Sequence, residues 1–219
     1  LQGSIAPYTL STLRVPDHEV QPTGDTCFCT TFTRGTGQEW RIGIIAEQWL
    51  EEGNIALYAS VLLQKQHEVF HGVGKSFPVN PSVFPGIPDF VSEYILSTDI
   101  LQISLDVGAK YKFYPLPLFI SLGIGTLYRL QSLNRLVERL SVSAVGHYNF
   151  PEQEYPSEFF RVLPFGIAST LRLGADVALA NGIYASPALF ASIQLREIYR
   201  YNLWAQALVG VHIALLAGW

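Results

Sequence analysis

Apolar and polar residues alternate along residues 101–113, LQISLDVGAKYKF. Every odd position is apolar, from Leu101 to Phe113, whereas the even positions carry glutamine, serine, aspartate, glycine and lysine. Successive side chains of a β-strand point to opposite faces, so a period of two predicts a strand with one apolar and one polar face. Residues 204–219 repeat the pattern, and the nearly apolar stretch that begins at Asn202 could also be a membrane-spanning helix. Their alternation and their glycines favour a strand instead.

The same alternation predicts further strands at 40–50, 55–66, 118–130, 163–179 and 183–196, and an N-terminal stretch near 5–15 fits it weakly. Short turns are predicted at Glu51–Asn54, Tyr114–Pro117 and Ala180–Gly182, the last with the strong hairpin signal Asn-Gly. Longer connections rich in proline, glycine and polar residues occupy about 16–37, 68–92 and 131–158, with a shorter one near 196–203. An even number of strands, joined alternately by short turns and long loops, is typical of a transmembrane β-barrel.

A soluble barrel of the lipocalin type would also have eight antiparallel strands, but its outer face would be polar. The outer faces predicted here carry too little charge for that, and aromatic residues near the strand ends resemble the girdles of membrane barrels. These aromatic residues are Trp40, Tyr111, Phe113, Tyr128 and Trp219. The sequence therefore predicts an all-β fold in which residues 1–219 form one eight-stranded antiparallel transmembrane up-and-down β-barrel. Short turns and both termini would face the periplasm, and the long loops would face outward.

The polar faces of the predicted strands would line the barrel lumen. They carry Arg41, Glu47, Gln102, Asp106, Lys110, Arg129, Arg172, Asp176 and His212. Eight strands enclose a space just wide enough for side chains, and unpaired charges there would be costly. We therefore expect a network of ion pairs that plugs the lumen, with a narrow gated conduit through a rearrangeable network as the alternative. The glycines of GIGTL (123–127) are expected to relieve crowding in this space.

Three parts of the chain carry a resemblance to a known family. They are the first loop with its cysteines followed by FTRGTGQEWRIGIIAEQ (32–48), AKYKFYPLPLFISLGIGTL (109–127), and the final strand ending in Trp219. Together they resemble the OmpA-type (OmpA/OmpX-like) outer-membrane β-barrel domains of Gram-negative bacteria, in particular those of the Bacteroidota–Chlorobi group. The resemblance covers essentially the whole chain. It implies an outer-membrane location, with the terminal aromatic Trp219 as a signal for the barrel-insertion machinery.

Composition narrows the range of functions. The chain has 14 Lys+Arg against 18 Asp+Glu and no basic run, so nucleic-acid binding has no electrostatic support. The chain has no methionine, even at position 1, which indicates processing and agrees with a removed signal peptide. Cys27 and Cys29 supply at most two metal ligands, and a disulfide between such near neighbours would be strained. We interpret them as thiols of a surface loop, with bonding to a partner or a cofactor as the alternative.

Residues 67–71, HEVFH, match the zinc-protease motif H-E-x-x-H letter for letter. In that motif a helix brings the two histidines onto one metal, and the glutamate activates water. Here the five residues follow an alternating segment and lead into GVGKSFPVNP, a helix-breaking loop. We expect a strand end, on which His67 and His71 lie too far apart to share one metal and no third ligand is evident. His67, Glu68 and His71 are therefore weak metal candidates.

Two of the long loops contain apolar residues that suggest contacts. Leu133, Leu136, Val137 and Leu140 have helical spacing, which predicts a short amphipathic helix within 131–158 that lies over the barrel mouth or against a partner. Residues 68–92 include Phe77, Phe84 and Phe90, and this much apolar content in a surface loop suggests an interaction site.

These observations predict an integral outer-membrane protein with a structural or scaffold role. Its extracellular loops would bind a partner, and other protein subunits could contact loops 68–92 and 131–158. Its remaining contacts would be outer-membrane lipid and the insertion machinery. A small gated channel or transport component is the alternative, and an outer-membrane enzyme comes third. We expect no catalytic residue and no cofactor.

Overall fold

The computed structural model describes residues 2–14, 31–50, 53–77, 90–142, 152–155, 162–198 and 202–217, most of them in β-strands. Eight long strands make up the fold: β1 (Gln2–Arg14), β2 (Thr31–Trp49), β3 (Ile55–Phe77), β4 (Phe90–Lys112), β5 (Leu118–Val142), β7 (Val162–Ala175), β9 (Ile183–Ile198) and β10 (Asn202–Ala217). Two short strands, β6 (Gln153–Tyr155) and β8 (Val177–Ala180), pair with β5 and β9 respectively. In this part of the chain no helix is long and apolar enough to cross a bilayer.

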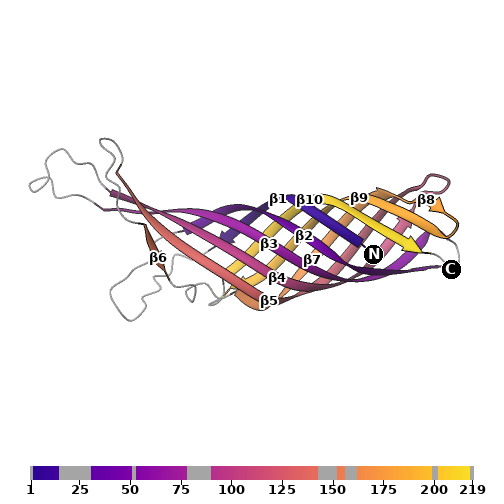
Figure 1. Ribbon diagram of the computed structural model, residues 1–219, viewed down its shortest axis with the longest axis horizontal. Helices are drawn as coiled ribbons and strands as arrows, with labels where there is room; N and C mark the ends of the chain where they lie inside the picture. Colours follow the sequence, from indigo (N-terminus) through magenta and orange to yellow (C-terminus); the bar gives the residue numbers. More distant parts are fainter. Residues whose placement is uncertain are drawn as a thin grey trace, which may run out of the picture.

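The long strands form one antiparallel sheet that closes on itself. Their order around the sheet is β1, β2, β3, β4, β5, β7, β9 and β10, and β10 pairs with both β9 and β1 (Figure 1). Closure gives each long strand two neighbours and removes the unpaired sheet edges that invite aggregation. The predicted set of eight antiparallel strands, each next to its neighbour in sequence, is confirmed.

The short turns lie at one end of the barrel, toward which the two termini also run (Figure 1). Leu50 N donates to Ile55 O at 2.9 Å across the first turn, and Phe113 N donates to Leu118 O at 2.9 Å across the second. In the third turn Gly182 has φ 73°, a left-handed conformation that glycine adopts without strain. The opposite end of the barrel holds the strand ends that lead into the longer connections. These connections are residues 15–30, 78–89 and 143–161.

Strand β1 shows why the alternation of residues 5–15 is weak. Its register shifts between Ile5 and Tyr8 against β10 and between Ala6 and Thr9 against β2, so one extra residue is inserted there. Pro7 lies at this bulge and has no N–H to donate to either neighbour. A bulge reverses the alternation of faces on either side of it, which hides a strand from a period-two search.

Several strands extend into residues that the sequence pattern assigned to loops. β2 begins at Thr31, β3 continues to Phe77, and β5 continues to Val142, within the predicted loops 16–37, 68–92 and 131–158. The predicted amphipathic helix is wrong, because its residues belong to β5 and pair with β4 from Leu133↔Asp99 to Leu140↔Ser92. A register shift near Leu130 moves the inward positions of β5 from odd to even residues. The helical spacing arose because apolar residues occupy both faces of β5 beyond this shift, with Leu133 outward and Leu136 inward.

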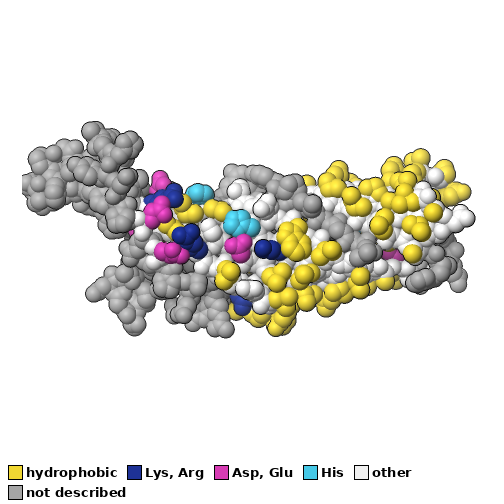
Figure 2. Space-filling model, in the orientation of Figure 1, with side chains coloured by type: hydrophobic (Ala, Val, Ile, Leu, Met, Phe, Trp, Pro, Cys, Tyr) yellow, Lys and Arg dark blue, Asp and Glu magenta, His cyan; other side chains and the backbone are white. Residues whose placement is uncertain are grey.

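The outer face carries a broad apolar band, here called the apolar belt (Figure 2). Its side chains are at least 38% exposed: Ile42, Ile44, Leu57, Val61, Leu105, Val107, Leu122, Ile124, Ile167, Leu171, Leu189, Ile193, Val209 and Val211. Aromatic side chains flank the belt, with Tyr111 and Phe113 toward the short turns and Trp40, Tyr128 and Phe165 on the other side. Beyond these, the outward positions of β3, β4 and β5 become charged, as at Lys65, Asp99 and Arg135.

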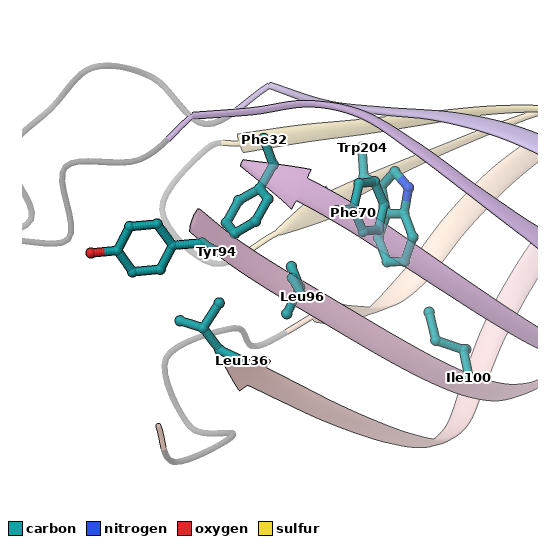
Figure 3. Packing of buried hydrophobic residues seen from close by; sticks show 7 residues of the cluster. All are labelled: Phe32, Phe70, Tyr94, Leu96, Ile100, Leu136 and Trp204. Atoms are coloured by element: carbon teal, nitrogen blue, oxygen red, sulfur yellow. The ribbon is translucent and has the colours of Figure 1, made fainter. Parts of the chain in front are cut away.

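Inside the barrel, beyond the belt, a group of buried apolar side chains fills the lumen (Figure 3). This apolar cluster comprises Phe32, Phe70, Tyr94, Leu96, Ile100, Leu136 and Trp204, each at most 6% exposed. Phe70 and Trp204 meet edge to face, with ring centroids 5.5 Å apart. The sequence analysis did not predict the cluster, because Phe32, Phe70 and Leu136 lay in segments assigned to loops and Tyr94, Leu96 and Ile100 lay between predicted elements.

Candidate functional site in the barrel lumen

The structure turns all nine predicted lumen residues inward. Glu47 and Arg129 are partly exposed, and the rest are buried: Arg41, Gln102, Asp106, Lys110, Arg172, Asp176 and His212. The predicted alternation of faces is thereby confirmed for these positions. Three further charged residues, Glu39, Glu68 and Arg196, are at most 2% exposed and were missed. They share the inward parity of Arg41, Gln64 and Gln194. Extending the predicted strands by a few residues would have found Glu39 and Glu68, and Arg196 is the last residue of the predicted strand 183–196.

Lys110 is the centre of an ionic group near the short turns. Its Nζ lies 2.9 Å from Asp176 Oδ1 and 3.2 Å from Glu47 Oε2, and its side chain is 2% exposed. Ser186 Oγ donates to the same Asp176 oxygen at 2.8 Å. The ammonium also lies 4.2 Å from the centroid of the Phe119 ring, within range of a cation–π interaction. Three strands and the residue between β7 and β8 thus meet around one buried cation.

Asp106 and Arg172 occupy the next stretch of the lumen. Asp106 accepts a hydrogen bond from Ser104 Oγ at 3.1 Å. The Arg172 guanidinium stacks over Tyr58 at 5.0 Å from the ring centroid. A Cβ atom on Gly125 would overlap the Asp106 carboxylate, and one on Gly123 would overlap the Tyr58 hydroxyl. The GIGTL glycines therefore make room for lumen side chains, as predicted.

A ladder of glutamines crosses the middle of the lumen. Gln102 Nε2 donates to Gln64 Oε1 at 2.6 Å, and Gln64 Nε2 donates to Ser104 Oγ at 2.8 Å. Gln194 Nε2 donates to Glu39 Oε2 at 3.1 Å, and the other oxygen of Glu39 is ion-paired with Arg41. These bonds connect β2, β3, β4 and β9 across the interior.

Among the described side chains, the inward charges balance. The inward cationic side chains are Arg41, Lys110, Lys112, Arg129, Arg172 and Arg196, and the inward anionic ones are Glu39, Glu47, Glu68, Asp106, Glu138 and Asp176. Balanced and paired charges are the condition under which ionic groups can be buried without a large penalty. A buried charged network is therefore present, as predicted, and the apolar cluster is a second group of buried side chains that the sequence did not reveal.

The HEVFH segment does not form a zinc-protease site. It lies within β3, paired with β2 and β4 on both sides. His67 and His71 point outward and are about 13 Å apart along the strand, while Glu68 points into the lumen. His67 Nδ1 instead lies 2.9 Å from Asp99 Oδ1 on the outer face of β4. Among the described residues no group of three His, Cys, Asp or Glu could hold a metal ion. The expectation that β3 ends at this motif is wrong.

The predicted partner-binding residues fall partly on strands. Phe77 and Phe90 are paired with each other where β3 and β4 meet, so the backbone at both positions is sheet, not loop. Phe84, Cys27, Cys29 and the insertion-signal residue Trp219 lie outside the described residues. Their predicted roles remain predictions.

Comparisons with known proteins assign no family. No protein-family model and no curated protein matches the chain. Among solved structures, one described as "Asymmetric conductivity of engineered proteins" matches with 10% identity, a TM-score of 0.14, and coverage of 97% of this chain and 98% of that one. A mutant of the Rh. blastica porin matches with the same identity, TM-score and coverage. At this TM-score neither match supports an argument about fold or function.

Proposed function

We propose that this chain is an integral outer-membrane β-barrel of the OmpA type with a structural or scaffold role, whose plugged lumen conducts nothing. The observation that carries the proposal is the pairing of an apolar outer belt with a charged, cross-linked interior. A soluble barrel has the reverse polarity, because water faces its outer surface. Outer-membrane lipid would cover the apolar belt, and the barrel-insertion machinery would place it there.

The dimensions of the belt fit a bilayer. The outward apolar runs of β4 (101–111) and β5 (118–130) meet or exceed the roughly 9–11 residues that a tilted strand needs to cross the hydrocarbon core. Aromatic residues stand on both sides of the belt, as in the girdles of membrane barrels. The short turns would then face the periplasm, and the part of the barrel beyond Trp40, Tyr128 and Phe165 would project from the cell.

That projecting part is where a partner would bind. Its outer face carries exposed ion pairs, Arg135 with Glu154 at 3.0 Å and Arg139 with Glu152 at 2.8 Å, in place of the apolar residues of the belt. It also leads into the connections around residues 78–89 and 143–151, which belong to the loops proposed to contact other subunits. Rigid strands that carry binding loops are a common arrangement for recognition. No catalytic residue, metal or cofactor is part of the proposal.

Purified protein in detergent is expected to migrate faster on an SDS gel without heating than after boiling, because a closed sheet without edges resists unfolding by SDS. Ser104→Pro is the control, since Ser104 pairs with Leu62 on β3 and Leu127 on β5, and proline there removes a ladder hydrogen bond. The control should lose the fast band. A wild-type protein that stays soluble and monodisperse without detergent would contradict the membrane location.

A small gated channel is the second candidate, and one observation favours it. Several buried polar atoms of the lumen, among them Gln66 Oε1 and Gln102 Oε1, have no hydrogen-bond partner among the described residues, as expected if water enters the lumen.

In planar bilayers the plugged barrel should show no steady current, whereas Phe70→Ala with Trp204→Ala should raise the current by removing part of the apolar cluster. Steady conductance of the wild-type protein would favour the channel instead.

A further inference from the structure

A hollow of about 500 Å³ lies in the apolar belt, on the outer face of the barrel. Its two sides are aliphatic side chains of β4 and β9, namely Leu105, Val107, Ile193 and Leu195. Between these sides, residues of β5 and β7 complete the lining, and Thr126 and Ser169 are among them. Thr126 pairs with Ile167, and Ser169 pairs with Ile124. The two residues with hydroxyl groups are therefore diagonal neighbours on adjacent strands.

Thr126 and Ser169 are the exceptions to an otherwise apolar surface. Every other outward position that the structure describes in the belt is apolar, within the ranges 42–46, 55–63, 101–109, 118–126, 167–173, 185–195 and 205–215. Both residues are exposed on the outer face, and neither hydroxyl group is hydrogen-bonded to another described side chain. Hydrocarbon offers no water to such groups, so a partner with its own hydrogen-bonding atom would be favoured there.

The depth of the two hydroxyl groups in the belt indicates which part of a lipid they would meet. Tyr128 and Phe165, with ring centroids 5.3 Å apart, are among the aromatic residues that flank the belt on the projecting side. Thr126 is the next outward residue inside Tyr128, and Ser169 is the second inside Phe165. On strands tilted by about 40°, these spacings correspond to depths of roughly 5 and 10 Å below the aromatic residues. Because such residues lie at headgroup level, the hydroxyl groups are level with the upper carbons of the acyl chains.

We propose that the hollow binds an acyl chain that carries a hydroxyl group a few carbons below its headgroup, in a lipid of the leaflet on the projecting side. The proposal rests on the outer-membrane location proposed above. The aliphatic sides of the hollow fit the methylene groups of the chain. The hydroxyl groups of Thr126 and Ser169 can each donate and accept, so they can bond the hydroxyl group of the chain in either direction. A chain without that group would leave both of them unpaired.

A second copy of the barrel fits the hollow less well. Ile124 and Ile167 lie beside the two hydroxyl groups and are 67% and 59% exposed, so they stand out from the surface. Another barrel would rest on these two side chains and would be held away from Thr126 and Ser169. An acyl chain is thin and flexible, and can lie between them.

The test is native mass spectrometry of the full chain in mild detergent with equal amounts of two lipids. One is di-tetradecanoyl phosphatidylethanolamine, and the other is the same lipid with a hydroxyl group on the third carbon of each chain. The wild type should retain the hydroxylated lipid about threefold to tenfold more, as one or two hydrogen bonds in hydrocarbon would give. Thr126→Val with Ser169→Ala keeps the hollow and removes both hydroxyl groups, so it should bind the two lipids equally.

Two enlarged side chains locate the binding. Ser169→Leu fills the hollow and should lower the preference for the hydroxylated lipid to none. Ala109→Leu, on the outer face of β4 but outside the hollow, should behave as the wild type. Equal binding of both lipids by the wild type, or a preference that survives in the Thr126→Val, Ser169→Ala variant, would overturn the proposal. Dimers that Ser169→Leu abolishes would also overturn it, in favour of a second copy. Each of these results leaves the membrane location standing, which the gel and solubility experiments address separately.

Discussion

Lys110→Met is expected to lower the free energy of unfolding by about 3–5 kcal/mol, the cost of leaving buried charges without their partner. Methionine keeps the length and apolar stem of lysine but removes the ammonium. Asp176 and Glu47, now 2.9 and 3.2 Å from Nζ, would then repel each other inside the barrel. Lys112 keeps its ion pair with Asp176, at 3.7 Å from Oδ2, but its side chain is 28% exposed, so it offsets only part of the loss. Urea unfolding of the refolded protein measures the change.

Two controls distinguish the cost of an unpaired buried charge from the cost of losing any ion pair. Arg139→Met breaks an ion pair whose side chains are 51% and 53% exposed, and should cost less than about 1 kcal/mol. The triple variant Lys110→Met, Glu47→Gln, Asp176→Asn removes the three charges together. It should recover most of the lost stability, because no buried charge is then left without a partner. A Lys110→Met barrel as stable as Arg139→Met would show that the lumen around Lys110 is well hydrated and does not act as a plug.

Alternation was enough to predict the membrane-length part of the fold. In β4 every outward position of the belt is apolar and every inward one is polar or glycine, so period two identifies both faces. In β10 the outward positions are all apolar, but Leu208 also faces inward. The turns follow from local chemistry, as in Asn181-Gly182, where glycine adopts a positive φ. Closure could be inferred only indirectly, from an even strand number, because sequence does not show that β10 returns to β1.

The projecting part of the barrel could not be predicted in the same way. Beyond the belt the outer face becomes charged and the inner face apolar, as at Lys65 outside and Phe70 inside, so the contrast between faces reverses. A strand prediction that requires apolar residues on the outer face therefore ends where the reversal begins. The bulge in β5 near Leu130 adds a change of parity. Beyond it, apolar residues lie on both faces of the strand, as at Leu133 and Leu136, and their spacing mimics a helix. Residues with glycine and proline nearby were therefore assigned to loops.

The inward-facing residues of the lumen could be predicted wherever apolar and polar positions alternate clearly along a strand. Arg41 and Asp106 were found because they lie within clear alternation, whereas Glu39 and Arg196 lie at the ends of such segments. Their pairing was not predictable, since Gln194 and Glu39 come from strands far apart in sequence and meet only across the closed barrel. The match of HEVFH to the zinc-protease motif was misleading because the match ignores secondary structure. Its spacing has a meaning on a helix, and a strand places its glutamate opposite its histidines.

Ile124→Arg is expected to lower the free energy of unfolding from phospholipid vesicles by about 2–4 kcal/mol, the cost of a lipid-facing arginine at the middle of a barrel strand. Ile124 is 67% exposed in the centre of the apolar belt on β5. Leu133→Arg is the matched control on the same strand, because Leu133 is 61% exposed but lies beyond the flanking Tyr128. The control should change stability by no more than about 1 kcal/mol, as surface substitutions usually do.

The pair of variants tests the environment of the belt directly, because both positions are equally open and receive the same side chain. In water, arginine at either site would be solvated, and neither substitution would cost more than an ordinary surface change. Only a hydrocarbon environment at Ile124 and an aqueous one at Leu133 separates the two. Equal and small effects in vesicles would mean that lipid does not surround Ile124, and the outer-membrane proposal would then fail even if the barrel itself is intact.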